Sequence, residues 1–257
     1  MNEHSRLRID SVDKDTWWHV TLDAAPGNII DLEMIRSLTE MADRAHDTPT
    51  LKAIVFSGAG AHFSYGVSIQ EHEPGPVAEL LPAFHDLFRS LFRARVFTIA
   101  AVTGHCLGGG LELASFCNRI VAAPGAQFGQ PEIRLGVFAP AGSVFLPWRL
   151  LPSKAEELCI TGRIVSAWEA FEIGLVDEIA AAPGAASLCF ARKYLSKLSA
   201  VSLRHAQAAT RLTLRRRFEQ VIGELERAYL DDLMATDDAQ EGVRAFLEKR
   251  EPRWRDS

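Results

Sequence analysis

The chain has 257 residues, of which 47% are hydrophobic and 24% are charged, a balance typical of a globular protein with a sizeable core. Twenty-eight Lys and Arg against 33 Asp and Glu give a net charge of −5, which excludes a protein-wide positive field for nucleic acid. The apolar run at 96–102 is too short to span a bilayer, and the charged opening, 1–15, lacks a signal-peptide core. We therefore expect a soluble, cytoplasmic protein without membrane or nucleic-acid partners.

The cysteines stand apart in the sequence. Cys106, Cys117, Cys159 and Cys189 form no CxxC pair and are not accompanied by a pattern of histidine ligands. Disulfide frameworks and zinc sites show cysteines at short, recurring spacings. The pattern therefore predicts reduced thiols and no metal site.

The first part of the chain is predicted to form a hairpin and a helix. Apolar residues alternate at 7–9 and 17–22 around a polar turn at 13–15, as in two paired strands. Asp31 stands where it can cap a helix whose apolar residues recur at helical spacing. That helix should end at about His46.

The middle of the chain alternates between strands and helices. Two short β-branched runs, 51–56 and 96–102, each end in a glycine-containing turn and predict buried strands. A helix is expected at 111–116 and a further strand at 119–123. Because strands alternate with helices, the predicted fold class is α/β.

The pattern is helical throughout 187–257. A long helix is predicted at 214–234, and a last one after Thr236, where Glu241 is expected to complete a start resembling a capping box. No Pro/Gly/Ser linker separates two halves of the chain. We expect one main domain, 1–186, followed by this helical region.

The strongest chemical signal lies at 104–114, Gly-His-Cys-Leu-Gly-Gly-Gly-Leu-Glu-Leu-Ala, where three glycines join a predicted strand to a helix. Without Cβ atoms the backbone can approach a ligand closely, and the first helical N–H groups have no partner within the helix. An anionic oxygen is favoured there, from either a phosphate or a developing enolate. The phosphate loop is disfavoured because Gly-Lys-Ser/Thr is absent. A tight turn that only needs small residues is the structural alternative.

Two carboxylic acids accompany this turn. Glu112 lies in the first turn of the glycine-led helix, and Glu132 follows a proline in the segment 126–136. Two carboxyl groups facing one pocket can hold a water between them, one removing a proton while the other donates one. Such a pair is typical of a hydratase or lyase. Each acid alone is also typical of a helix first turn, so the prediction depends on their meeting in space.

These two segments, with 62–69 upstream and 236–250 at the end, resemble the crotonase (enoyl-CoA hydratase/isomerase) superfamily over essentially the whole chain. The resemblance implies a crotonase-like spiral of ββα units followed by a C-terminal helical trimerisation region. It therefore implies a homotrimer or a dimer of trimers. It also implies an acyl-CoA thioester as substrate, no cofactor, and a thioester enolate that the site stabilises.

The resemblance also assigns roles to residues. It places the oxyanion hole on two backbone N–H groups, those of Tyr65 and Gly109, and the two catalytic acids on Glu112 and Glu132. Isomerases of the family typically keep only one of these acids. The presence of both favours addition or elimination of water.

Two segments depart from the common hydratase pattern. Where enoyl-CoA hydratases usually read Gly-Ala-Asp, residues 66–68 read Gly-Val-Ser. Where they read Pro-Gly-Ala-Gly-Gly, residues 139–143 read Ala-Pro-Ala-Gly-Ser. Pro140 cannot offer a backbone N–H, so a water that a glycine would bind at that place must be held differently here.

These variant segments resemble the hydratases that act on cyclohexa-1,5-diene-1-carbonyl-CoA in anaerobic benzoyl-CoA breakdown. That resemblance implies addition of water at the β-carbon of a cyclic dienoyl thioester and protonation of a remote ring carbon, giving 6-hydroxycyclohex-1-ene-1-carbonyl-CoA. The expected substrate-binding residues are Ser68, His72, Phe138 and Pro140. His72, between two glutamates, has a solvated charged loop as its alternative.

Two alternative functions stay open. The nearer one is a straight-chain enoyl-CoA hydratase with the same two acids and a narrower acyl pocket. The other is a crotonase-fold RNA-binding protein. The arginines at 215–217, with Arg204 and Arg211, are candidates to meet the phosphates of either CoA or RNA. The net charge and the two acids argue against RNA, and a solvated helix face is the simpler account of that cluster.

Overall fold

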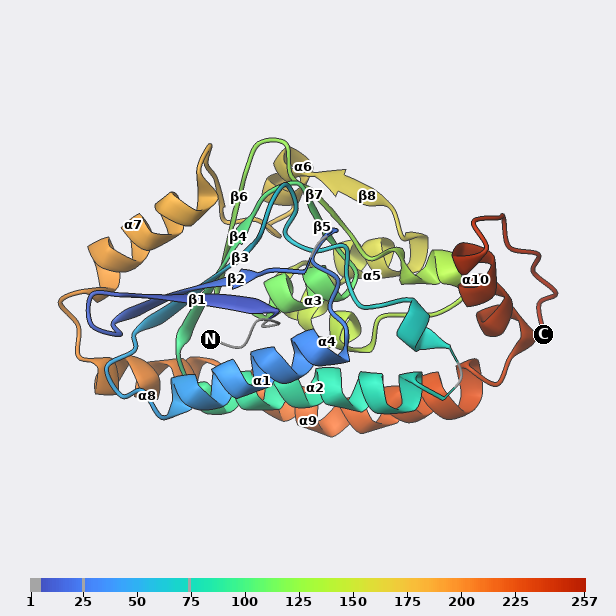
Figure 1. Ribbon diagram of the computed structural model, residues 1–257, viewed down its shortest axis with the longest axis horizontal. Helices are drawn as coiled ribbons and strands as arrows, with labels where there is room; N and C mark the ends of the chain where they lie inside the picture. Colours follow the sequence, from blue (N-terminus) through green and yellow to red (C-terminus); the bar gives the residue numbers. More distant parts are fainter. Residues whose placement is uncertain (1–5, 25, 74) are drawn as a thin grey trace.

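The computed structural model describes residues 6–24, 26–73 and 75–257, and two sheets form the framework of these residues (Figure 1). The larger sheet has the strand order β1-β2-β3-β4-β6-β9, and the smaller has the order β5-β7-β8. Their bounds are Leu7–Val12 (β1), Trp17–Leu22 (β2), Ala53–Gly58 (β3), Phe97–Val102 (β4), Arg119–Ala122 (β6) and Glu178–Ile179 (β9), then His105–Leu107 (β5), Gln127–Gly129 (β7) and Ile164–Ser166 (β8).

Helices cover the large sheet and extend beyond it, and α1, α2 and α9 lie side by side in one layer (Figure 1). Three short segments, η1, η2 and η3, are 3₁₀ or π turns. The bounds are Leu32–His46 (α1), Gln70–His72 (η1), Val77–Ala94 (α2), Gly109–Phe116 (α3), Pro131–Leu135 (η2), Pro140–Arg149 (α4), Pro152–Thr161 (α5), Ala167–Glu172 (α6), Pro183–Leu195 (α7), Ala200–Thr210 (α8), Leu212–Arg227 (α9), Ala228–Leu233 (η3) and Asp237–Leu247 (α10).

The predicted hairpin and first helix are confirmed. Strands β1 and β2 pair in antiparallel register, and the turn residues 13–15 adopt the left-handed backbone conformation. Asp31 caps α1, because its side chain accepts the N–H of Met34 at 2.8 Å. The helix ends at His46, as expected.

The α/β prediction is also confirmed, and the parallel pairing of β2, β3, β4, β6 and β9 explains the apolar central runs. Alternate side chains of a strand point to opposite faces of its sheet. Accordingly Ile54 and Phe56 of β3 lie in the main core, while Val55 joins a second core with Leu195 of α7. Both faces are covered, so these strands need apolar residues throughout.

The helical region differs from its predicted bounds. It begins at Pro183, and the predicted long helix is α9 followed by the π turn η3. The capping-box prediction was wrong. Thr236 caps α10 by accepting the N–H of Ala239, whereas Glu241 lies too far along the helix and pairs with Arg250 at 2.5 Å. The division at residue 186 stays a prediction.

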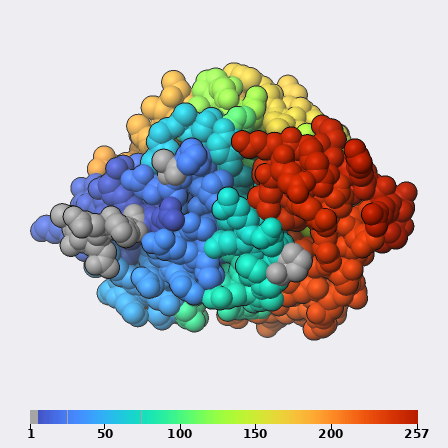
Figure 2. Space-filling view, turned by 45° about the vertical axis from the view of Figure 1, so that its right-hand side comes forward, coloured from blue at the N-terminus to red at the C-terminus, as the bar shows by residue number. Residues whose placement is uncertain are grey.

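The last residues form one end of the molecule, where they lie next to the segment around α2 (Figure 2). There α10 packs on η2, and a Cβ on Gly242 would be 2.1 Å from the carbonyl oxygen of Leu135. This close packing fixes η2, the turn that carries Glu132. Within the described ranges, no helix is long and apolar enough to cross a membrane.

Candidate active site

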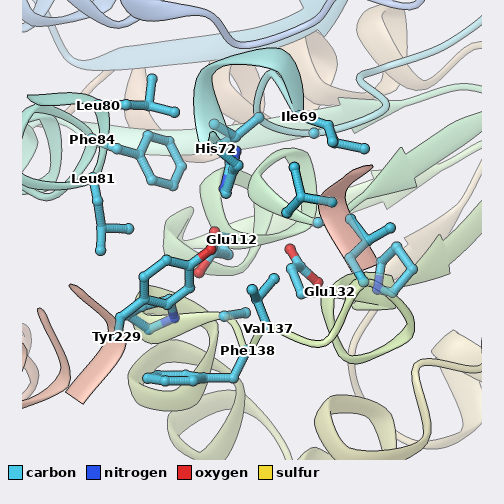
Figure 3. Close-up of a pocket in the computed structure, with 18 of the residues that line it drawn as sticks. Ile69, His72, Leu80, Leu81, Phe84, Glu112, Glu132, Val137, Phe138 and Tyr229 are labelled. Carbon is cyan, nitrogen blue, oxygen red and sulfur yellow. The ribbon is translucent and has the colours of Figure 1, made fainter. Parts of the chain in front are cut away.

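A cavity with about 70 Å³ of space for water-sized molecules opens between α2, α3, η2, η3 and the start of α4 (Figure 3). Most of its wall is apolar. The polar side chains that line it are Tyr65, His72, Glu112, Glu132 and Tyr229. The structure therefore brings both predicted acids into one pocket. The sequence alone could not show that the two acids meet in space.

Glu112 lies on the first turn of α3 and is 4% exposed. Its Oε1 accepts the N–H of Gly142 at 2.5 Å, and the N–H of Ala141 also bonds to the carboxylate. Burial raises the pKa of Glu112, while these two N–H groups oppose the rise. The N–H groups stabilise the charged form, so Glu112 is the better candidate for the base.

Glu132 lies on η2 against the glycine turn, since a Cβ on Gly108 would be 2.7 Å from its Oε1. That oxygen accepts the side-chain amide of Gln130 at 3.1 Å. The other oxygen, Oε2, is buried without a hydrogen-bond partner among the described residues. Burial, and then the negative charge of Glu112, raises the pKa of Glu132. Glu132 is therefore the better candidate to hold the proton of the pair and to act as the acid.

The predicted oxyanion hole needs one correction. The N–H of Tyr65 donates to the carbonyl of Gly27 at 2.9 Å, so it is not free to bind a substrate oxygen. The N–H groups of Val67 and Gly109 make no hydrogen bond within the described part of the chain. They are neighbours, because a Cβ on Gly109 would be 3.2 Å from the Val67 nitrogen. In this structure Val67 and Gly109 are therefore the candidate oxyanion-hole pair, in place of the predicted Tyr65 and Gly109.

The expected substrate-binding residues fall in two places. His72, Phe138 and Pro140 line the cavity with the acids. Ser68 lies in a neighbouring groove, where its hydroxyl accepts the N–H of Glu71 at 3.4 Å. The Ser68 carbonyl is 2.6 Å from His72 Nδ1, and burial lowers the pKa of His72. Ser68 therefore positions His72, and this structure does not place its hydroxyl in the acyl cavity.

Comparison with known proteins shows which family this chain belongs to. The family model described as enoyl-CoA hydratase/isomerase matches residues 14–257. The chain belongs to the enoyl-CoA hydratase/isomerase family. A cyclohexa-1,5-dienecarbonyl-CoA hydratase from Thauera aromatica is 44% identical to this hydratase over 227 residues, 88% of each chain.

Two further proteins support the same membership. A probable enoyl-CoA hydratase from Mycobacterium tuberculosis is 36% identical over 232 residues, covering 88% of this chain and 89% of that protein. The crystal structure of an enoyl-CoA hydratase from Mycobacterium avium matches with a TM-score of 0.85 at 25% identity, covering 97% of this chain and 98% of that one. The enzyme is therefore a hydro-lyase with the crotonase fold.

The arginines singled out in the sequence lie outside the hydratase cavity. Arg204 donates to backbone carbonyls near the ends of α1 and α2, including that of Ala94 at 2.8 Å, and Arg211 donates to the carbonyl of Phe116 at 2.6 Å. These bonds satisfy carbonyls that have no partner within their own helices. The cluster at 215–217 is exposed on α9. No group of potential metal ligands gathers in the described residues.

Sequence reasoning missed one polar residue of the hydratase cavity, Tyr229. It lies in η3, inside the run that was predicted as one long helix. Its side chain is 1% exposed and its ring packs against Phe138, with ring centres 5.4 Å apart. A single tyrosine in a helical pattern gives no signal of this position, because only the π turn decides which way it faces.

Proposed function

We propose that this enzyme adds water to cyclohexa-1,5-diene-1-carbonyl-CoA and forms 6-hydroxycyclohex-1-ene-1-carbonyl-CoA. The observation that carries the chemistry is that Glu112, which is 4% exposed, and Glu132, whose Oε2 is buried, line one largely apolar cavity. The observation that favours the cyclic substrate is the 44% identity to a protein named for this substrate.

In the proposed mechanism Glu112 takes a proton from water as the oxygen attacks the β-carbon, C2 of the ring. The electrons of C1=C2 move onto the thioester. The thioester oxygen accepts hydrogen bonds from the N–H groups of Val67 and Gly109. The resulting dienolate includes C5=C6 of the ring. Glu132 then gives its proton to C5, and C1=C6 becomes the double bond of the product. The elements of one water have been added, with no oxidation or reduction.

The lining of the cavity supports a ring-shaped acyl group. Phe84 and Phe138, with Leu80, Leu81 and Val137, give a broad apolar wall around the acids (Figure 3). Flat apolar walls with a few placed polar groups are the usual design of sites for such ligands. The straight-chain alternative is supported by the relatives named enoyl-CoA hydratase, which share less identity with this chain.

Side-by-side hydration of two thioesters tests the substrate. We expect kcat/KM for the cyclic dienoyl-CoA to be at least about tenfold above that for crotonyl-CoA, a preference that needs only ~1.4 kcal/mol of transition-state binding. The cyclic substrate fills more of the apolar wall, which is the source of the preference. Equal or better activity on crotonyl-CoA would favour the general enoyl-CoA hydratase instead.

We also propose that the enzyme assembles as a homotrimer or a dimer of trimers. Large apolar side chains are exposed on α4, α5, α6 and the segments between them: Trp148, Leu151, Ile160, Ile164, Trp168 and Phe171. Such a concentration is unusual on a free surface and typical of an interface. Light scattering at micromolar concentration should give the mass of three or six chains. A stable monomer would contradict this assembly.

A further inference from the structure

The Tyr229 ring forms part of the cavity wall, and its hydroxyl points toward the two glutamates (Figure 3). Oη is buried and has no hydrogen-bond partner in the part of the chain that the structure describes. A buried hydroxyl without a partner costs about 1–3 kcal/mol, so such groups are rarely left unpaired. We expect a molecule bound in the cavity to supply the partner.

Tyr229 is held in place by its surroundings. Its ring packs edge-on against Phe138 and against His72, with ring centres 5.4 Å and 6.4 Å away. Its carbonyl accepts the N–H of Met234 at 2.9 Å, the bond that defines the π turn η3. Single π turns inside helices occur frequently at functional sites. The backbone and both ring contacts therefore hold the hydroxyl in one direction.

The start of α4, which also borders the cavity, offers no free donor. Pro140 has no N–H, and those of Ala141 and Gly142 bond to Glu112. The N–H of Ser143 donates to the carbonyl of Ala139 at 2.9 Å. A water beside Glu112 must therefore accept its hydrogen bond from another group.

We propose that the Tyr229 hydroxyl donates a hydrogen bond to the oxygen that hydration adds, first as the attacking water and then as the product hydroxyl. The water would direct one proton at Glu112 and accept from Tyr229 with one lone pair, which leaves its second lone pair for the β-carbon. This inference rests on the proposed hydratase function and names the group that orients the water.

The electrostatics of the cavity suit a donor. Burial raises the pKa of Tyr229 above its ordinary value, and negative charge on either glutamate, Glu132 or Glu112, raises it further. The phenol therefore keeps its proton across the pH range in which the enzyme works. It is a hydrogen-bond donor in the site, and the proton transfers stay with the two glutamates.

Tyr229→Phe tests the inference because it removes only the oxygen. We expect kcat for hydration to fall about tenfold or more, the loss of one well-placed hydrogen bond, while the KM of the enoyl thioester is unchanged. In the dehydration direction the KM of the hydroxyacyl-CoA should rise, because its hydroxyl loses a partner. Tyr194→Phe, on the exposed part of α7, is the matched control and should change neither constant.

Thermal unfolding separates this role from a structural one. Since Oη has no partner among the residues that the structure describes, Tyr229→Phe should be at least as stable as the parent enzyme without substrate. Unchanged kinetics in both directions, with a parent enzyme that hydrates its thioester, would overturn the inference and leave the proposed function standing. A parent enzyme that hydrates neither cyclic dienoyl-CoA nor crotonyl-CoA would overturn the proposed function, and this inference with it.

Discussion

Glu132→Gln and Glu112→Gln are each expected to lower kcat by about two or more orders of magnitude, the usual contribution of a positioned acid or base. Gln has nearly the shape of Glu but can neither take a proton from water nor deliver one to carbon. In Glu112→Gln the N–H groups of Ala141 and Gly142 also lose the charge that they stabilise. Steady-state hydration of the preferred thioester measures both losses.

Stability measurements distinguish a loss of catalysis in these variants from a loss of folded protein. The Glu132 pKa is raised above its ordinary value of 4.5 in the folded state, so the folded protein binds this proton more tightly than the unfolded chain does. The free energy of unfolding is therefore reduced as pH rises above about 4.5. Glu132→Gln lacks this penalty, so at pH 8 it should be at least as stable as the parent, and the difference should shrink near pH 4.

A surface charge provides the control for both variants. Glu156→Gln, on the exposed side of α5, removes the same charge without touching the cavity and should keep the parent's turnover. Turnover like that of the parent in Glu112→Gln or Glu132→Gln would remove that residue from the mechanism.

Gly109→Val is expected to cost about a hundredfold or more in rate, comparable to the loss of one oxyanion-hole donor. A Cβ at this position would be 2.3 Å from Val67 Cγ2 and 3.2 Å from the Val67 nitrogen. The added side chain would therefore displace one N–H of the hole and occupy the space of the thioester oxygen. Single-turnover kinetics should show slow chemistry after substrate binds.

A valine substitution at a second glycine is the control, because it measures how much activity is lost when any glycine is replaced. Gly125 lies in the turn before β7, and a Cβ there would meet no atom within 4 Å. Gly125→Val should therefore hydrate the substrate normally. If folded Gly109→Val also did so, the oxyanion hole would lie elsewhere.

Features encoded by nearby residues could be predicted from the sequence. The cap of α1 depends on Asp31 and on the N–H of Met34, and the hairpin depends on alternation across one turn. The acids were found because each follows a local signal, a glycine turn before Glu112 and a proline before Glu132. Their meeting in one cavity depends on Glu132 of η2 lying against the glycine turn that precedes α3, a contact that no local pattern contains.

The oxyanion hole and Tyr229 depend on contacts between distant segments. Whether Tyr65 or Val67 has a free N–H is decided by the carbonyl of Gly27, from a loop that precedes α1. The direction of Tyr229 is decided by the π turn η3, which the helical periodicity of 214–234 does not reveal. The free N–H of Val67 and the direction of Tyr229 are both decided by backbone hydrogen bonds. The pattern of side chains in a sequence carries little information about such bonds.

The most direct test of the proposed function is the position of the new proton. When the enzyme converts cyclohexa-1,5-diene-1-carbonyl-CoA in D2O, NMR of the product should show the hydroxyl on C6 and one non-exchangeable deuterium on C3, the carbon opposite it in the ring. This pattern requires attack at the β-carbon and delivery of the second proton across the ring, the step that the proposed mechanism assigns to Glu132. Deuterium on C1, next to the thioester, or no conversion of this substrate while crotonyl-CoA is hydrated, would contradict the account.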